Sequence, residues 1–486
     1  MTARVGFVLT EVSAACACAW VGAFGWLGKF SLAGGAWPKR GAAPTVIVMA
    51  RLLVATVPLT GHVHPMLMVV RELVARGHDV RWYAARKFRP EIEAAGARFA
   101  AMQAAHDWDD ADVEAAIPAL RGRRGISRVK AQLRGMFIAS MVDQLRDLEA
   151  LLDAQPADAI IADQAHLGAA LVAEKRGVPW AGLGISALII SSVDTMPFGS
   201  GMPPMGRRGN RIFNWLILRA LFADINRSYR RSRVAAGLPA GTGTYFDVLS
   251  PQLYLQPTIP ELEYPRSDLP PHIHFIGPLV PREQPGAAAL PGWWPDVEDA
   301  GSRGVPIVLV TQGTLATDTR ELIQPSLRGL AGDNVLVVVT TGKLDALVQP
   351  SNARAAAYVP YQALLPRVAA MVTNGGYGGV QMAVRHGVPL VIAGGSEEKP
   401  EIAARLAWSG AAIDLRTGRP RPAAVKAAVR RVLGEPAFRD RAKALGAEMA
   451  RYDAPSLAAE LIEALVARRA PILRGERALA AGDDAA

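Results

Sequence analysis

From residue 51 onward, short apolar runs alternate with segments whose apolar residues recur at helical spacing. The run 52-LLVATV-57 is typical of a buried strand, and 65-PMLMVVRELVAR-76 is typical of an amphipathic helix. Pro65 suits the first helical position, and Gly77 suits a helix end. The run 79-DVRWYA-84 is the next strand, so the order is βαβ, which the handedness rule places in a parallel sheet.

The same alternation recurs in two blocks. A second unit consists of a strand at 158–162, a helix at 167–176 and a strand at 178–184, and the pattern restarts at 306–311. A chain of 486 residues is too long for one core, so we expect two doubly wound α/β domains. We divide the chain into an extension outside the fold (1–48), a first Rossmann-like domain (49–268), a Pro-rich linker (269–303), a second Rossmann-like domain (304–468) and a disordered tail (469–486).

The first residues favour a cytoplasmic protein with an upstream extension. Residues 12–28 are nearly all apolar, but much of the run is Ala and Gly, and a membrane span needs about 20 strongly apolar residues. A secretory signal fits no better. Met49 opens the stretch 49-MARLLVATVP-58, which contains the first strand. The only cysteines, Cys16 and Cys18, are too few for a disulfide framework.

The formal net charge of +10 is concentrated in two stretches, 121–135 and 206–234. Each is interpreted either as a solvated basic face or as a surface that meets anionic lipid or an apolar substrate, because arginines flank an apolar helical segment at 211–222. Peripheral contact with the inner face of the membrane is therefore an alternative to a freely cytoplasmic protein. No nucleic-acid-binding module is recognisable, so nucleic acid is not an expected partner. The sequence does not indicate an oligomeric state.

The stretch 372-VTNGGYGGVQMAVRHGVPL-390 places four glycines between a strand and a helix. In parallel sheets such joints bind ligands, because helix N-termini direct free N–H groups outward. A diphosphate is the natural candidate, and a plain tight turn is the alternative. The segments 311-TQGTLA-316 and 340-TTGK-343 put Gly, Thr or Lys at two more strand ends of the same half. The dinucleotide and Walker fingerprints do not appear, which disfavours a nicotinamide or ATP site.

These motifs together resemble the UDP-glycosyltransferase and macrolide-glycosyltransferase superfamily, over most of residues 51–466. The resemblance implies the GT-B fold, with two Rossmann-like domains that face a cleft. It rests on 358-YVPY-361, 374-NGGYGG-379, 386-HGVPL-390 and 398-EK-399, which occur in the family's order and spacing. The donor-binding residues that it implies are Gly313, Thr314, Tyr358, Val359, Asn374, Gly375, Gly376, Gly378, Gly379, Gln381, Glu398 and Lys399.

Four positions depart from the family's pattern. Asn374 stands where the family has His, and its amide can donate to phosphate but without a charge. Met382 stands where a ribose-binding Glu is expected, so that contact is assigned to Gln381. Lys399 replaces Gln, and Tyr358 replaces a Trp that stacks on the base. Donor identity is therefore the part of the site that the sequence specifies least.

The catalytic side resembles the same family through 58-PLTGHVHPMLMVVRELVARGHDV-80. The resemblance implies that His62 is the base that takes the proton of the acceptor hydroxyl, and imidazole titrates near neutral pH. Asp163, at the end of strand 158–162, would orient it, although an Asp after a strand is more commonly a helix cap. Gly61 and His64 are placed on the acceptor side, with a cap before Pro65 as the alternative for His64.

The predicted function is an inverting hexosyltransferase. It would move a hexose or deoxyhexose from a UDP- or dTDP-sugar to a hydroxyl of a lipophilic small molecule or a glycolipid. No cofactor or metal is required: 107-DWDD-110 imitates a metal motif, but no strand precedes it. The alternatives are a nucleotide-sugar epimerase and a catalytically degenerate GT-B protein that acts as a partner or activator.

Overall fold

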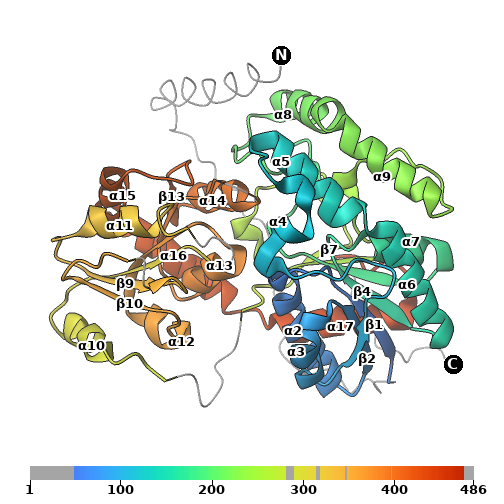
Figure 1. Ribbon diagram of the computed structural model, residues 1–486, viewed down its shortest axis with the longest axis horizontal. Coiled ribbons are helices and arrows are strands. Elements are labelled where there is room, and N and C mark those ends of the chain that lie inside the picture. The colour runs from blue at the N-terminus through green and yellow to red at the C-terminus, as the bar shows by residue number, and fades with distance from the viewer. Residues whose placement is uncertain (1–48, 281–288, 314–317, 345–346, 396, 476–486) are drawn as a thin grey trace. The chain divides into compact units, whose positions relative to one another are not determined.

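A computed structural model describes residues 49–280, 289–313, 318–344, 347–395 and 397–475. The predicted extension, with both cysteines, lies outside the described residues. Residues 46–478 group into one compact unit. Within it the described strands form two parallel sheets with helices on their faces, so the predicted α/β architecture is confirmed (Figure 1).

The first sheet has seven strands in the order β3-β2-β1-β4-β5-β6-β7. Its strands are β1 (Arg51–Ala55), β2 (Asp79–Ala84), β3 (Arg98–Ala101), β4 (Ala159–Asp163), β5 (Trp180–Leu183), β6 (Leu253–Gln256) and β7 (Ile273–Phe275). The helices of this half are α2 (Thr60–Ala75), α3 (Arg89–Ala94), α4 (Val113–Ala116), α5 (Gly125–Gln132), α6 (Met141–Ala154), α7 (Leu167–Arg176), α8 (Arg207–Asn214) and α9 (Ala223–Ala235), with π-helical segments η4 (Leu133–Ile138) and η5 (Trp215–Leu221). Strand order reverses between β1 and β4, and ligands bind parallel sheets at such a point.

The second sheet has six strands in the order β10-β9-β8-β11-β12-β13. Its strands are β8 (Ile307–Thr311), β9 (Leu336–Thr340), β10 (Ala353–Ala356), β11 (Val368–Thr373), β12 (Leu390–Ile392) and β13 (Ala412–Asp414). The helices that follow the first sheet are α10 (Trp294–Ser302), α11 (Ile323–Leu330), α12 (Tyr361–Leu364), α13 (Tyr377–Arg385), α14 (Lys399–Trp408), α15 (Pro422–Gly434), α16 (Pro436–Met449) and α17 (Ala454–Arg468). Separate apolar clusters cover its two faces, so this half has its own core.

Helix α2 begins earlier than its sequence predicts. It starts at Thr60, which leaves Pro65 inside the helix, so the predicted start at Pro65 is wrong. The carboxylate of Asp110 accepts hydrogen bonds from the Thr60 N–H at 2.7 Å and from its hydroxyl at 3.1 Å. A cap from 50 residues away thus satisfies a free N–H of the helix start. Gly77 ends the helix with a φ of 89°, as expected.

The predicted linker contains regular structure. Strand β7 is the edge of the first sheet, and α10 buries Trp294, Val297 and Ala300 in the core of the second half. Neither element was predicted, because the sequence around them is rich in Pro and shows no clear periodicity, and β7 has only three residues. The domain boundaries themselves stay a prediction.

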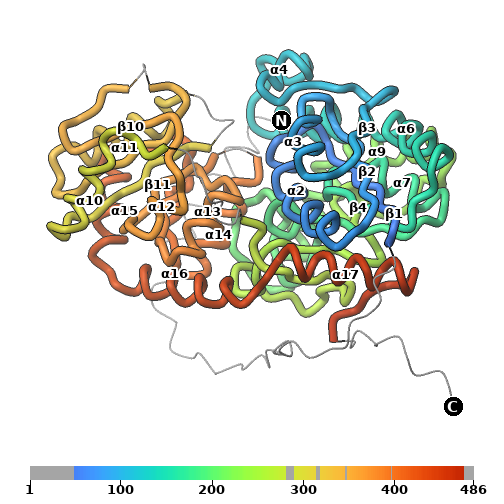
Figure 2. The backbone as a smooth tube through the Cα atoms, turned by 90° about the horizontal axis from the view of Figure 1, so that it is seen from below, coloured from blue at the N-terminus to red at the C-terminus, as the bar shows by residue number. Residues whose placement is uncertain are grey.

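The last helix packs on the first sheet and not on the second. Figure 2 shows α17 running along the half of the molecule that contains β1, β4 and α2. Its side chains Leu461, Ile462 and Leu465 are buried in the same apolar cluster as those elements. Beyond it, Ile472 is also buried, and its N–H donates to the Gln252 carbonyl at 2.9 Å. The predicted tail is therefore attached to the protein at Ile472, and residues 476–486 lie outside the described residues.

Candidate active site

His62 and Asp163 meet at the carboxyl ends of two neighbouring strands. His62 lies in the first turn of α2, which follows β1, and Asp163 is the last residue of β4. Because β1 and β4 pair in parallel, these two ends lie side by side. His62 Nδ1 is 3.0 Å from Asp163 Oδ1, and the residues are 8% and 1% exposed. The structure thus brings the predicted catalytic pair together.

The surroundings of Asp163 keep it ionised. Its Oδ2 accepts the Val57 N–H at 2.8 Å, and its Oδ1 also accepts the Ala165 N–H at 2.8 Å. Burial alone would raise the pKa of this carboxyl, but His62 and the Val57 N–H outweigh it, so the pKa is lowered. A carboxylate at this position accepts a hydrogen bond from the N–H of His62 Nδ1, so the free lone pair of the imidazole is on Nε2.

The helix after Asp163 has a different cap. His166 precedes α7, and its Nδ1 accepts the Ala169 N–H at 3.2 Å. The alternative role of Asp163 as the cap of this helix is therefore wrong. His166 is buried, and desolvation lowers the pKa of its imidazole to about 4, so it is neutral at pH 7. No motif in the sequence marks His166, because a histidine between a strand and a helix carries no pattern of its own.

The two residues predicted on the acceptor side are both exposed. Gly61 lies in the first turn of α2, and nothing would lie within 4 Å of a Cβ there. His64 Nε2 is 3.3 Å from Glu91 of α3, in an exposed pair. Since the helix begins at Thr60, His64 is not the predicted cap before Pro65.

The glycine-rich stretch forms the joint between β11 and α13. Gly375 has a φ of 93°, and a Cβ there would lie 3.0 Å from Ile392 Cγ2, so this position requires glycine. Gly376 is the N-cap of α13, and Gly378 and Gly379 lie in its first turn. A Cβ on Gly376 or Gly378 would meet nothing within 4 Å. The N-terminus of α13 therefore has open space beside Gly376 and Gly378.

Asn374 lies where the ends of β8 and β11 meet. Its Nδ2 donates to the Gln312 carbonyl, and its buried Oδ1 has no hydrogen-bond partner among the described residues. A Cβ on Gly313 would lie 3.5 Å from that oxygen, so the predicted residues Gly313 and Asn374 are neighbours. The neighbouring predicted residue Thr314 lies outside the described residues. The Nδ2 donor of Asn374 is thus hydrogen-bonded to the protein's own main chain.

Glu398 and Lys399 begin α14 beside the glycine-rich joint. A Cβ on Gly375 would lie 3.5 Å from the Lys399 carbonyl oxygen, so the starts of α13 and α14 are adjacent. Burial, and then the charge of Glu397, raise the pKa of Glu398, while His62 acts in the opposite direction. Glu398 is therefore within electrostatic reach of His62. The ammonium of Lys399 pairs with Glu397.

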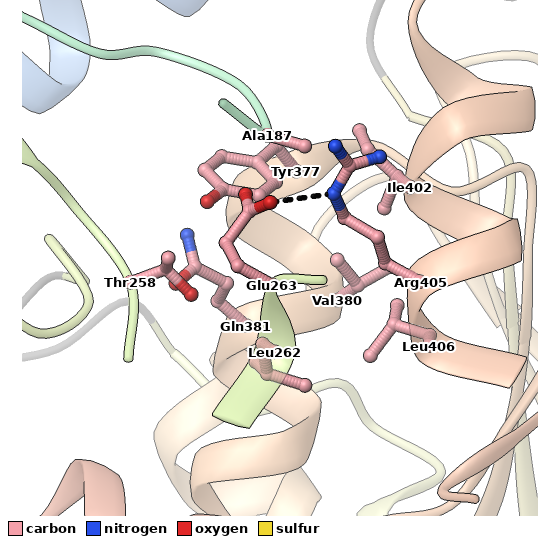
Figure 3. Close-up of a pocket in the computed structure, with 10 residues that line it drawn as sticks. All are labelled: Ala187, Thr258, Leu262, Glu263, Tyr377, Val380, Gln381, Ile402, Arg405 and Leu406. Carbon is pink, nitrogen blue, oxygen red and sulfur yellow. Dashed lines mark hydrogen bonds and ion pairs between the residues drawn. The ribbon is translucent and has the colours of Figure 1, made fainter. Parts of the chain in front are cut away.

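The remaining predicted donor residues are placed differently. Tyr358 is 64% exposed, as a stacking platform must be, whereas Val359 is 1% exposed and belongs to the core. Gln381 is buried, and within the described part of the chain its Oε1 has no hydrogen-bond partner. It lines a small cavity of about 10 Å³ together with Thr258 and Tyr377 (Figure 3). That volume suits a single water molecule and not a sugar nucleotide.

The acidic stretch 107–110 is engaged in ion pairs. Asp107 pairs with Arg86 at 2.8 Å, and Asp110, the cap of α2, pairs with Lys87. The described residues contain no cluster of His, Cys, Asp and Glu that could hold a metal ion. Within the same described ranges, no helix is long and apolar enough to cross a membrane.

Comparison with known proteins identifies the family. A model described as the C-terminal domain of erythromycin biosynthesis protein CIII-like proteins matches residues 329–467. The chain is 44% identical over 424 residues to 4'-demethylrebeccamycin synthase of Lentzea aerocolonigenes, which covers 86% of this chain and 100% of that protein. It is 34% identical over 439 residues to UDP-glycosyltransferase 2 of Phaeomoniella chlamydospora, which covers 86% and 96%.

A solved structure supports the fold. The glycotransferase of kitacinnamycin matches with a TM-score of 0.68 and 22% identity, over 86% of this chain and 99% of that one. The two parallel sheets with their helices are thus the GT-B fold that the sequence predicted. The chain belongs to the UDP-glycosyltransferase and macrolide-glycosyltransferase superfamily and is a glycosyltransferase.

Proposed function

We propose that the protein is an inverting glycosyltransferase that uses His62 as its base. It moves a hexose or deoxyhexose from a UDP- or dTDP-sugar to a hydroxyl of a lipophilic small molecule. The observation that carries the proposal is the buried contact of 3.0 Å between His62 Nδ1 and Asp163. The names of the two relatives, a rebeccamycin-related synthase and a UDP-glycosyltransferase, support a natural-product acceptor and a nucleotide-sugar donor.

In the proposed reaction, the acceptor hydroxyl attacks the anomeric carbon of the donor. Its proton moves to His62 Nε2 while its oxygen forms the new glycosidic bond. The bond between the anomeric carbon and the diphosphate oxygen breaks, and its electron pair leaves with the nucleoside diphosphate. Asp163 stabilises the imidazolium that forms, as in hydrolase triads. A single displacement of this kind inverts the anomeric configuration.

The donor side of the proposal uses the starts of α13 and α14. Free N–H groups and the helix dipole favour an anion at the N-terminus of α13, where Gly376 and Gly378 leave room for close approach. Glu398 would accept hydrogen bonds from sugar hydroxyls, since it begins α14 within electrostatic reach of His62. In this proposal no metal is required, because helix N-termini stabilise the leaving diphosphate.

A further part of the proposal is peripheral contact with anionic lipid, which would suit a lipophilic or glycolipid acceptor. The α8–η5 surface, formed by residues 207–221, turns the amide of Asn214 inward: its Nδ2 donates to the Ser192 and Thr195 carbonyls at 3.0 and 2.9 Å. Its outer face carries Ile212, Trp215 and Leu216, which are 65%, 64% and 47% exposed. Exposed arginines flank this apolar face, and a surface of that kind suits a membrane interface.

The proposed function is tested by product analysis. The purified protein is incubated with a panel of UDP- and dTDP-sugars and hydroxylated lipophilic aglycones. Nucleotide release, product mass and the anomeric configuration of the product are measured. We expect a glycoside whose configuration is inverted relative to the donor. A product with retained configuration would exclude the direct displacement, and saturable donor binding without any product would favour the degenerate partner protein.

A further inference from the structure

A buried charge cluster joins elements of the two halves of the molecule. Arg405 of α14 contacts Glu263, which follows β6, with 2.7 Å between Arg405 Nε and Glu263 Oε2 (Figure 3). Its Nη1 pairs with Glu401, one turn earlier in the same helix. The three side chains are between 1% and 4% exposed. Burial alone would lower the pKa of Arg405, but the two carboxylates outweigh it and raise the pKa.

The same carboxylates fix the 186–201 segment, which follows β5 in the first half. Glu401 Oε2 accepts the N–H groups of Gly199 and Gly201, both at 3.0 Å. Glu263 Oε1 accepts the N–H of Leu188 at 2.8 Å. A Cβ on Gly201 would lie 2.9 Å from Pro400 Cβ, so this segment touches the first turn of α14. Both ends of the segment are therefore attached to the Arg405 cluster.

A second contact links the start of α13 to the same segment. The Tyr377 hydroxyl accepts a hydrogen bond from Gln256 Nε2 at 3.2 Å, and that nitrogen also donates to the Ser186 carbonyl at 2.8 Å. Gln164, the neighbour of Asp163, donates through Nε2 to the Ser186 hydroxyl at 3.1 Å. The 186–201 segment thus lies between the strand end that holds Asp163 and the helix starts that carry the predicted donor site.

Such a cluster contributes more to geometry than to stability. Removing two carboxylates and a guanidinium from water costs several kcal/mol per ion, and well-packed apolar residues are often as stable. Apolar residues in place of the cluster would lose its directed hydrogen bonds, because the planar guanidinium of Arg405 contacts two carboxylates at fixed angles. The cavity beside it is only about 10 Å³, so the side chains around it leave little freedom to shift.

We propose that Arg405 is a positioning residue for sugar transfer. Through Glu263 and Glu401 it holds the 186–201 segment against α14, and it thereby sets the distance between the proton-accepting His62 and the anomeric carbon of the donor. This inference rests on the proposed function. It predicts that loosening the cluster slows transfer but leaves donor binding intact, because none of these three side chains is among the predicted donor-binding residues.

The test uses Arg405→Lys, which keeps the charge but loses the planar fork. We expect an unchanged donor Kd and a fall in kcat of about tenfold or more, since small misplacements of reacting groups cost up to about 100-fold. We also expect water to hydrolyse a larger share of the donor, so that less of the sugar is transferred. The matched control is Arg431→Lys, which alters an exposed pair with Glu435 on α15. Equal kcat and equal transfer-to-hydrolysis ratios in the two variants would overturn the inference.

A second variant keeps the test decisive if Arg405→Lys does not fold. Glu263→Gln retains an oxygen for the Leu188 N–H but loses the charge that Arg405 contacts. We expect the same slower transfer, with faster hydrogen exchange across the 186–201 segment. Wild-type exchange and wild-type kcat in this variant would contradict the inference. The exchange measurement needs no substrate, so failure of the wild type to transfer any sugar counts against the proposed function and not against the attachment of this segment.

Discussion

At the scale of single residues, two histidines near Asp163 differ in the role of the same ring nitrogen. His62 Nδ1 faces the Asp163 carboxylate and therefore carries a proton, whereas His166 Nδ1 accepts the Ala169 N–H and therefore does not. The first arrangement prepares an imidazole to take up a proton at Nε2. The second keeps an imidazole neutral inside the protein, where no described residue accepts a hydrogen bond from its Nε2.

His166 leads to a prediction about stability and pH. Its pKa is about 4 in the folded protein against 6.5 ordinarily, so between these values the unfolded chain binds more protons. Stability therefore falls as pH drops from 6.5 to about 4, by at most about 1.4 kcal/mol per pH unit. His166→Asn keeps a cap for α7 and should flatten this slope in urea unfolding at pH 5 and 7.5.

The control for this prediction is His64→Asn, because His64 is exposed. It should leave the slope between pH 5 and 7.5 as it is in the wild type. If His166→Asn has the full wild-type slope, the neutral state of His166 is not the cause of the acid sensitivity.

Side-chain direction limited how much of the site could be predicted. His62 and Asp163 were assigned through the resemblance to the family. The structure brings them together because the ends of the parallel neighbours β1 and β4 meet at one edge of the sheet. Val359 and Gln381 were assigned to the donor site by motif position, but their side chains are buried in the protein interior. Arg405 was missed because its partner Glu263 is 142 residues away and no local pattern marks a buried ion pair.

At the scale of elements, the joint between β11 and α13 leads to a second prediction. Gly378 lies in a helix and has open space at its Cβ position, so Gly378→Ala should raise helix stability by up to about 1 kcal/mol. If the diphosphate approaches this turn, the added methyl group obstructs it. We then expect the donor Kd to rise about tenfold, or about 1.4 kcal/mol, in calorimetric titration with UDP or dTDP.

Gly434→Ala is the matched control, since Gly434 is also a helical glycine with open space at its Cβ position but lies at the end of α15, away from the joint. It should leave the donor Kd unchanged. An unchanged Kd in Gly378→Ala as well would place the diphosphate elsewhere, and the joint would then be the plain tight turn that the sequence left open.

The elements that sequence predicted best are long and strongly periodic. Strand β2 and helix α7 have the bounds that their patterns predict, 79–84 and 167–176. Strands β10 and β13 were missed because ARAA and AID are too short and too polar to show a strand pattern. The start of α2 was missed for another reason: its cap comes from Asp110, which only the folded chain brings near.

At the scale of the whole molecule, the last helix, α17, belongs by packing to the first half of the molecule although it comes last in the sequence. Nothing local in the sequence of α17 says which sheet the helix covers. Its apolar side chains Leu461, Ile462 and Leu465 pack in the core of the first sheet. The chain therefore returns at α17 to the half in which it began.

The α8–η5 surface leads to a third prediction, about membranes. Segment 206–234 contains eight arginines and a single acidic residue, Asp224, which already pairs with Lys130 and Arg134. We expect the protein to sediment with vesicles of anionic phosphatidylglycerol, and less so at high salt. Arg208→Gln with Arg211→Gln should weaken this binding about tenfold or more, since each arginine contributes about 1 kcal/mol near such a surface.

Arg430→Gln with Arg431→Gln on α15 removes the same charge elsewhere and is the control. It should bind vesicles as the wild type does. Equal weakening by the two pairs would mean that net charge and not this surface drives the binding, and sedimentation with neutral phosphatidylcholine alone would indicate a purely apolar contact.

The central claim, that His62 oriented by Asp163 is the base, is tested most directly by single-turnover sugar transfer at saturating donor and acceptor. We predict that His62→Ala and Asp163→Asn each slow transfer by about 100-fold or more, with an unchanged donor Kd. Asp158→Asn, in the residue just before β4, should transfer at the wild-type rate, because the Asp158 carboxylate accepts the exposed Arg51 N–H, far along the strand from His62. Wild-type transfer by His62→Ala would contradict the claim.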